Sequence, residues 1–246
     1  MKIASISDVH GMWNKIEHFP PADVLVCAGD LLANAGFGYF TKDEEAAYQL
    51  TELKAFHDFL KAFKDSGHYK EVVVVAGNHD WVFERRNADA RAILTDVIYL
   101  QDDSAVIDGV KFHGSPWQRW FWDWAFNLPN HDENFYRYRA HATKIYDLIE
   151  DDVNVLVTHG PPHEVGVQPS SGLLGLDYVP RGMNVGDPIM AKRCDKLEHL
   201  KAHIFGHIHC GYGQFTDFKG CQNVNTAICN EAYEPDNPVP VIEIEV

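Results

Sequence analysis

Five short apolar segments, most of them rich in β-branched residues, are each followed closely by Asp, Asn or His, and this feature constrains the fold more than any other. The segments are residues 3–6, 24–28, 72–76, 153–158 and 203–205. Short runs of this kind are typical of strands that are buried on both faces. The carboxyl ends of parallel strands share one edge of a sheet, where ligands bind. We therefore expect the polar residues that follow these strands to surround a single site.

The intervening sequence predicts three helices. Apolar residues recur at helical spacing in residues 43–65, which indicates an amphipathic crossover helix between the second and third strands. A second helix is expected over residues 134–149. A third should begin after the N-cap Asp187, with Pro188 in its first turn, and end near Leu200.

Weaker apolar runs predict two hairpins and a strand at the end of the chain. The dipeptides Asp108-Gly109 and Lys219-Gly220 suit the tight turns of such hairpins. The weak strands are residues 105–107, 110–113, 212–215, 222–225 and 239–246. The whole pattern favours an α/β fold with two mixed β-sheets and helices outside them. A chain of 246 residues fits one domain over residues 1–246.

Charge and cysteine content exclude several classes of protein. The chain has 21 Lys and Arg against 36 Asp and Glu, a net charge of −15. Stable polynucleotide binding is not expected, because it depends on neutralising phosphates, but bound metals would still admit a small phosphorylated substrate. The five cysteines form no C-x-x-C pair, which argues against a disulfide scaffold or a cysteine zinc site. No run approaches a membrane span, so we expect a cytoplasmic protein without membrane contact. Self-association is left open.

The loops after the five strong strands carry oxygen and imidazole donors. They are Asp8, His10, Asp30, Asn78, His159, His207 and His209. Taken singly, each is more readily explained as a turn residue or a buried core residue than as a ligand. Seven donors exceed the needs of one catalytic ion but suit two ions that share a carboxylate. A donor set without thiolate favours two divalent ions, Mn²⁺ first, with Fe, Zn²⁺ and Ni²⁺ as alternatives.

The same motifs resemble the calcineurin-like metallophosphoesterase superfamily. They are Asp8-x-His10, Gly29-Asp30, Gly77-Asn78-His79-Asp80, His159 and Gly206-His207-x-His209. The resemblance implies a four-layer αββα sandwich with a dinuclear metal centre. It assigns Asp8, His10 and His209 to the first metal. It assigns Asn78, His159 and His207 to the second, with Asp30 bridging. His79 would contact the phosphoryl group or protonate the leaving oxygen, and Asp80 would orient His79.

A closer resemblance is to the metallophosphoesterase-domain-containing subfamily. The motifs that carry it are Gly114-Ser115-Pro116-Trp117, Asn127-Leu128-Pro129, Thr158-His159-Gly160-Pro161-Pro162 and the run from Gly206 to Gly213. The chain departs from that pattern at Cys210, where Glu is expected, and in a longer insertion around residues 168–178. Cys210 is expected to fill space rather than to bind metal.

These observations predict a phosphodiesterase that acts by attack of a metal-bridging hydroxide. The subfamily resemblance points to 2′,3′- or 3′,5′-cyclic nucleotides as substrates. Residues 117–124 hold four of the six tryptophans, so Trp117 is a candidate to stack on a nucleobase and Arg119 to bind an anion. The alternative is that these rings only pack a long loop. Two other functions stay open, a broad phosphomonoesterase and a non-catalytic scaffold.

Overall fold

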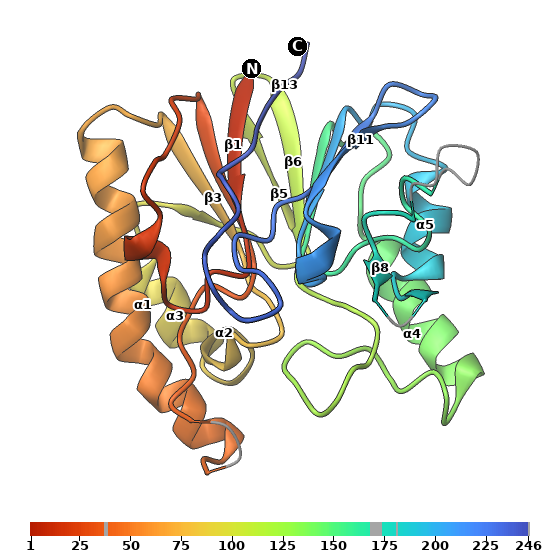
Figure 1. The fold of residues 1–246 in the computed structure, drawn as a ribbon, viewed down its shortest axis with the longest axis horizontal. Helices are drawn as coiled ribbons and strands as arrows, with labels where there is room; N and C mark the ends of the chain where they lie inside the picture. The colour runs from red at the N-terminus through yellow and green to blue at the C-terminus, as the bar shows by residue number, and fades with distance from the viewer. Residues whose placement is uncertain (37–38, 168–173, 181, 246) are drawn as a thin grey trace.

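A computed structural model describes residues 1–36, 39–167, 174–180 and 182–245. In it, two mixed β-sheets pack face to face and helices cover both outer faces (Figure 1). The layers therefore follow the order helices, sheet, sheet, helices, which confirms the predicted αββα sandwich. Residues 168–173 of the 168–178 insertion lie outside the described residues.

The first sheet has five strands in the order β13-β1-β2-β3-β4. Their bounds are β1 Lys2–Ile6, β2 Val24–Ala28, β3 Glu71–Val75, β4 Ile98–Tyr99 and β13 Val241–Glu243. Strands β1 to β4 are parallel, and β13 is antiparallel to β1. The C-terminal strand begins later than in the predicted range 239–246, since Pro240 has no N–H to donate to a ladder, and it ends at Glu243. Residue 246 lies outside the described residues.

The second sheet has six strands in the order β11-β12-β10-β7-β6-β5. Their bounds are β5 Asp103–Ile107, β6 Val110–Ser115, β7 Val155–Thr158, β10 Ala202–Phe205, β11 Gly213–Thr216 and β12 Gln222–Asn225. Both predicted hairpins are confirmed, β5 with β6 and β11 with β12. Asp108 and Gly109 both have positive φ, as a tight hairpin turn requires. A separate short pair, β8 (Tyr178–Val179) and β9 (Met183–Asn184), was not predicted.

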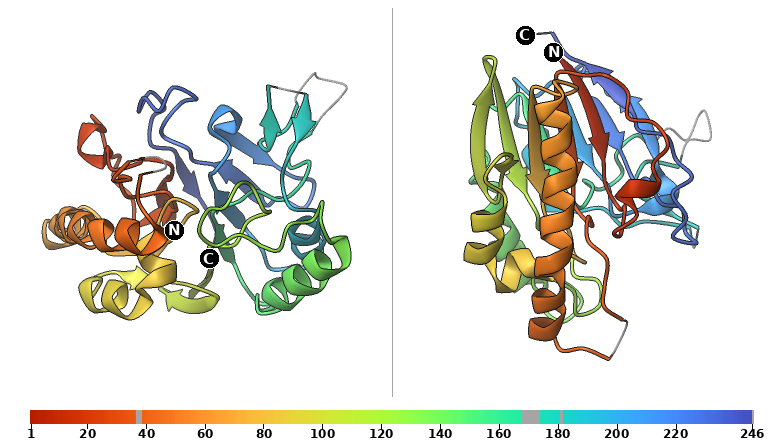
Figure 2. Two further views of the ribbon diagram at one scale, coloured as in Figure 1. Left: turned by 90° about the horizontal axis from the view of Figure 1, so that it is seen from below. Right: turned by 90° about the vertical axis from the view of Figure 1, so that its left-hand side faces the viewer.

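Helices lie on opposite outer faces of the sandwich (Figure 2). The first sheet is covered by α1 (Lys42–Asp65), α2 (Trp81–Arg85) and α3 (Asn87–Ile93), and the second by α4 (Phe135–Tyr146) and α5 (Pro188–Cys194). Two 3₁₀ turns, η1 (Trp13–Lys15) and η2 (His209–Gly211), lie in loops. Helices α4 and α5 end earlier than predicted because their last turns tighten into i to i−3 hydrogen bonds, such as Ile149 to Tyr146 and Leu197 to Cys194.

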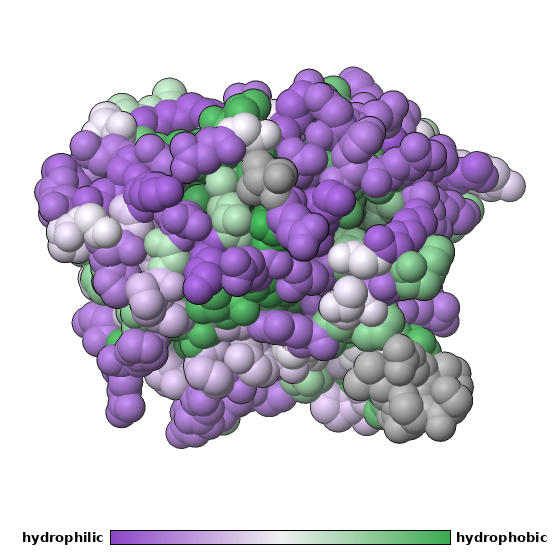
Figure 3. All heavy atoms as spheres, turned by 90° about the horizontal axis from the view of Figure 1, so that it is seen from above, coloured by the Kyte–Doolittle hydropathy of each residue, from purple (hydrophilic) through white to green (hydrophobic). Residues whose placement is uncertain are grey.

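Burial on both faces explains the unbroken apolar runs. In β2, Val24, Val26 and Ala28 face the second sheet, whereas Leu25 and Cys27 face the helices. Each strand of this kind needs apolar residues at every position, not at alternate ones. Seen from the side that carries the termini, the surface is mostly hydrophilic, with apolar residues between the two halves (Figure 3). No helix in the described part of the chain could cross a bilayer.

Candidate metal centre

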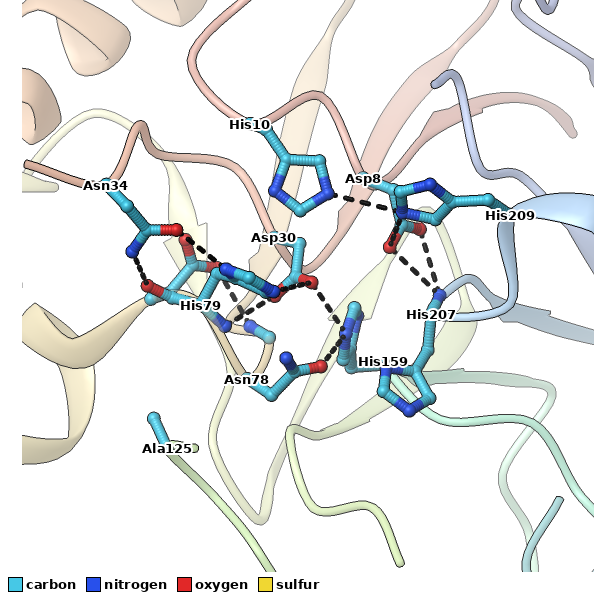
Figure 4. A network of polar contacts seen from close by, with 12 residues as sticks. Asp8, His10, Asp30, Asn34, Asn78, His79, Ala125, His159, His207 and His209 are labelled. Atoms are coloured by element: carbon cyan, nitrogen blue, oxygen red, sulfur yellow. Dashed lines mark hydrogen bonds and ion pairs between the residues drawn. The ribbon is translucent and has the colours of Figure 1, made fainter. Parts of the chain in front are cut away.

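The loops that follow β1, β2, β3, β7 and β10 converge at one place, as expected for the carboxyl ends of parallel strands. Figure 4 shows the side chains from these loops pointing toward one another around Asp30. The structure brings together all seven predicted donors. They are Asp8, His10, Asp30, Asn78, His159, His207 and His209.

Asp8, His10 and His209 form the first group of donors. Their ligand atoms all lie within 4.8 Å of one another. His209 Nε2 is 3.4 Å from Asp8 Oδ1 and 3.3 Å from His10 Nε2. Two imidazole nitrogens and a carboxylate oxygen thus face one point, which is a geometry that suits a bound cation.

Asp30, His159 and His207 form a second group within the same 4.8 Å limit. His159 Nε2 is 3.3 Å from Asp30 Oδ2 and 2.8 Å from Asn78 Oδ1, so the amide oxygen joins this group. Asp30 also lies within reach of His10, which belongs to the first group. A carboxylate between two donor groups is placed where a bridging ligand is needed.

Backbone carbonyls orient two of the histidines toward the centre. His159 Nδ1 lies 3.0 Å from the Ala28 oxygen, and His209 Nδ1 lies 2.9 Å from the Asn230 oxygen. Each Nδ1–H therefore donates to a carbonyl and leaves Nε2 facing the donor group. Metal-binding histidines are held in this way in proteins generally, so the arrangement fits a bound metal.

The charges of the site are balanced between carboxylates and imidazoles. Burial raises the pKa of Asp8, but the hydrogen bond and charge of His209 outweigh it and bring the pKa to about 2. Burial lowers the pKa of His209 and of His159, yet Asp8 and Asp30 respectively raise each to about 9. Buried carboxylates need a positive partner. Divalent cations fit this role and would release protons from the histidines on binding.

The backbone of these loops is strained where the donors lie. Asp8, His10, Asp30 and His207 all have φ between 43° and 68°, a region that is uncommon for residues other than glycine. Such strain gathers at functional sites, where the surrounding structure holds it in place. Gly206 is required for a different reason, because a Cβ there would collide with Ser7 and with Asp8 Oδ2.

His79 lies at the edge of the centre and is held on several sides. Its backbone N–H donates to Asp30 Oδ1 at 2.7 Å, and its ring packs on Trp124 with centroids 4.0 Å apart. Burial lowers the pKa of this histidine. Its Nδ1 lies 2.6 Å from Asn34 Oδ1, an interaction that the sequence did not suggest.

Asp80 makes its hydrogen bonds to backbone N–H groups of the two loops beside His79. Its carboxylate accepts hydrogen bonds from the backbone N–H groups of Leu31, Leu32 and Gly77 at 2.8–3.2 Å. Burial and the charge of Asp30 raise the pKa of Asp80 to about 7. Asp80 therefore ties the loop of Asp30 to the loop of His79, while Asn34 faces Nδ1 of the His79 ring.

A cavity of about 580 Å³ opens beside the centre and has aromatic walls. Its lining includes Asp30, His79, His207 and His209 from the centre, and six large rings, Phe40, Trp81, Phe121, Trp122, Trp124 and Tyr233. Lys42 also lines it and forms an ion pair of 2.8 Å with Asp123 in the tryptophan-rich loop. This loop also contacts the backbone beside the centre, since the Ala125 N–H donates to the backbone oxygen of Asn78 at 3.0 Å.

The two predicted substrate contacts lie elsewhere. Trp117 donates from Nε1 to Asp102 Oδ2 at 2.8 Å and packs edge-on against the buried Phe126. Arg119 donates to the Gly186 oxygen at 3.2 Å. Neither is among the residues that line the cavity, whereas other rings of the same loop are.

Sequence reasoning missed Tyr233 and Phe40 as well as Asn34. The ring of Tyr233 lies 4.8 Å from that of His10 and 5.2 Å from that of His209, and its φ of 59° is unusual for a bulky residue. None of these residues belongs to a recognisable motif. Cys210 is exposed and its Sγ faces the Tyr178 oxygen, which agrees with a role outside the donor set.

A two-sheet sandwich with Asp, Asn and His donors gathered at its strand ends is the architecture of a metallophosphoesterase. The chain belongs to the calcineurin-like phosphoesterase family, which matches residues 1–211. This family indicates metal-dependent hydrolysis of phosphoester bonds, and the His and Asp donor groups fit divalent metal ions.

Relatives place the chain near the metallophosphoesterase-domain-containing subfamily. It is 31% identical to metallophosphoesterase domain-containing protein 1 of Homo sapiens, over 99% of this chain and 71% of the relative. A UPF0046 protein of Caenorhabditis elegans is 30% identical, over 94% of this chain and 71% of the relative. A solved structure with 16% identity matches with a TM-score of 0.59, over 91% of this chain and 89% of that one, and supports the fold.

Proposed function

We propose that the protein is a phosphodiesterase that hydrolyses small nucleotide diesters, with 2′,3′- and 3′,5′-cyclic nucleotides as the first candidates. The observation that carries this proposal is that residues of both donor groups line an aromatic-walled cavity. A phosphoester at the donor groups would extend its organic substituent into the cavity. Aromatic rings can stack on any nucleobase, because every base has a π-face.

The chain's own residues supply positioning and proton transfer. Bound divalent cations, Mn²⁺ first, would bind phosphoryl oxygens and activate water. His79 lines the cavity next to Asp30, so its ring can protonate the departing oxygen. The Trp124 ring packs against His79 at a tilt of 35° and shields one side of that ring from solvent. The seven donors with His79 beside them support an enzyme over a non-catalytic scaffold.

Two further features support a small substrate and an intracellular setting. The net charge of −15 disfavours a polynucleotide, whose binding requires many basic side chains. All five cysteines are free, which suits a reducing compartment. We therefore include a cytoplasmic location in the proposal.

The proposal is tested by hydrolysis of bis-p-nitrophenyl phosphate and p-nitrophenyl phosphate, each with Mn²⁺ and with EDTA. We expect Mn²⁺-dependent turnover that favours the diester, because the cavity offers room for a second substituent. Cyclic nucleotides follow, with a non-nucleotide dialkyl diester as control. A preference for the monoester would indicate a phosphatase. Turnover that persists in EDTA would contradict the metal-dependent mechanism.

A further inference from the structure

Helix α1 carries two polar side chains on the face that it buries. Glu45 is 6% exposed and Gln49 is fully buried, and both belong to the face that packs Ala46 and Leu53 against the first sheet. Residues four apart lie above one another on a helix. Burying a polar side chain costs free energy unless it is hydrogen-bonded. The hydrogen-bond partners of Glu45 and Gln49 therefore indicate the role of these two residues.

Both side chains reach the loop of His79. Gln49 donates from Nε2 to the His79 oxygen at 2.7 Å and accepts from the Val82 N–H at 3.1 Å. Glu45 accepts from Asn34 Nδ2 at 3.0 Å and from the Ala35 N–H at 2.8 Å. One helix thus holds the backbone of His79 directly and contacts its side chain through Asn34.

The contact with Glu45 fixes which way the Asn34 amide points. A carboxylate can only accept hydrogen bonds, so the amide NH₂ must face Glu45. The amide oxygen then faces His79 Nδ1 at 2.6 Å, and can only accept. His79 therefore carries a proton on Nδ1. Figure 4 shows Asn34 on one side of the His79 ring and Asp30 on the other.

We propose that Glu45, acting through Asn34, is a positioning residue that selects the tautomer and orientation of His79. The inference rests on the proposed function, in which His79 serves the phosphoester. With Nδ1–H committed to Asn34, Nε2 is the nitrogen that exchanges a proton with the site. It lies 3.9 Å from Asp30 Oδ2, on the side of the donor groups.

Without the Glu45 carboxylate, the Asn34 amide keeps only a long contact of 3.5 Å from Nδ2 to the His79 backbone oxygen, so turning over costs it little. Its NH₂ would then donate to Nδ1, which would have to be unprotonated, and the single proton of a neutral ring would move to Nε2. A turned amide also opposes a doubly protonated ring, because its NH₂ would face the Nδ1–H. The ring would be a poorer proton donor although no metal donor had changed.

The first test reads the tautomer by ¹⁵N NMR of histidine-labelled, Zn²⁺-loaded protein, with the His79 signals assigned from a His79→Gln spectrum. We expect the Nδ1–H form in the wild type and in Glu45→Gln, which keeps an acceptor oxygen. In Glu45→Leu we expect a shift toward the Nε2–H form. Asn34→Ala, a change in a loop, should also lose the Nδ1–H preference and serves if Glu45→Leu does not fold. Asp58→Asn, a carboxylate 83% exposed on the same helix, is the matched control and should be unchanged.

The second test compares leaving groups at saturating Mn²⁺. In Glu45→Leu and Asn34→Ala we expect kcat for a diester with an alkoxide leaving group to fall roughly tenfold or more, within the range that a general acid supplies. The kcat for bis-p-nitrophenyl phosphate should change much less, since p-nitrophenolate needs little protonation. An unchanged tautomer in both variants, or equal losses for both leaving groups, would overturn the inference. A wild type that hydrolyses neither diester would instead refute the proposed function, while the NMR test still reports on Glu45.

Discussion

Replacing Asp30 by Asn is expected to remove bound metal and to abolish phosphoester hydrolysis. Asp30 lies between the two donor groups, and Asn would offer one neutral acceptor oxygen in place of a charged carboxylate. The loss of metal affinity and of activity should exceed roughly 100-fold, which is the upper end of the effect of removing an outer-shell partner of a metal. Metal content per chain and kcat are measured on the same preparation.

A matched control separates metal loss from the general effect of an Asp to Asn change. Asp132, whose side chain is 82% exposed, lies outside both donor groups, so Asp132→Asn should keep metal and activity. An Asp30→Asn protein with normal metal content and normal turnover would show that Asp30 is not a ligand.

Replacing His79 by Ala is expected to slow turnover by ~10²–10⁴-fold while metal stays bound, since general acid catalysis has that range. The metal measurement is essential, because His79 lies close enough to His10 and Asp30 to act as a donor itself. A proton donor leaves the metal content unchanged when removed, whereas a ligand does not. His18→Ala, at an exposed position, is the control.

Either of two outcomes for His79→Ala would contradict its assignment as proton donor. Full activity would show that the ring does not take part in the reaction. Loss of metal in proportion to activity would make His79 a ligand. The leaving-group comparison adds a separate criterion, since only a proton donor has its largest effect on alkoxide leaving groups.

The sandwich could be predicted from the sequence because the patterns that specify its strands and turns each lie within a few consecutive residues. Strands buried on both faces appear as unbroken apolar runs, as β2 and β3 do, and hairpin turns appear as dipeptides such as Asp108-Gly109. The donors could be predicted because each directly follows such a strand. Parallel topology then brings positions as far apart as Asp8 and His209 together.

The substrate side could not be predicted, because it depends on which way loop side chains turn. Trp117 and Trp124 belong to one short segment, yet the first packs toward Asp102 and the second against His79. Asn34 and Glu45 meet only once α1 has packed on the sheet, so no local pattern records their contact. Helix ends were misjudged where final turns tighten, as after Cys194.

Metal stoichiometry tests the central claim most directly. Metal-free protein is titrated with Mn²⁺ while bound metal is counted and the electron paramagnetic resonance spectrum is recorded. Two donor groups that share Asp30 predict two ions per chain and a spectrum in which the two ions are magnetically coupled. Saturation at one ion per chain, or two ions without coupling, would contradict a centre bridged by Asp30.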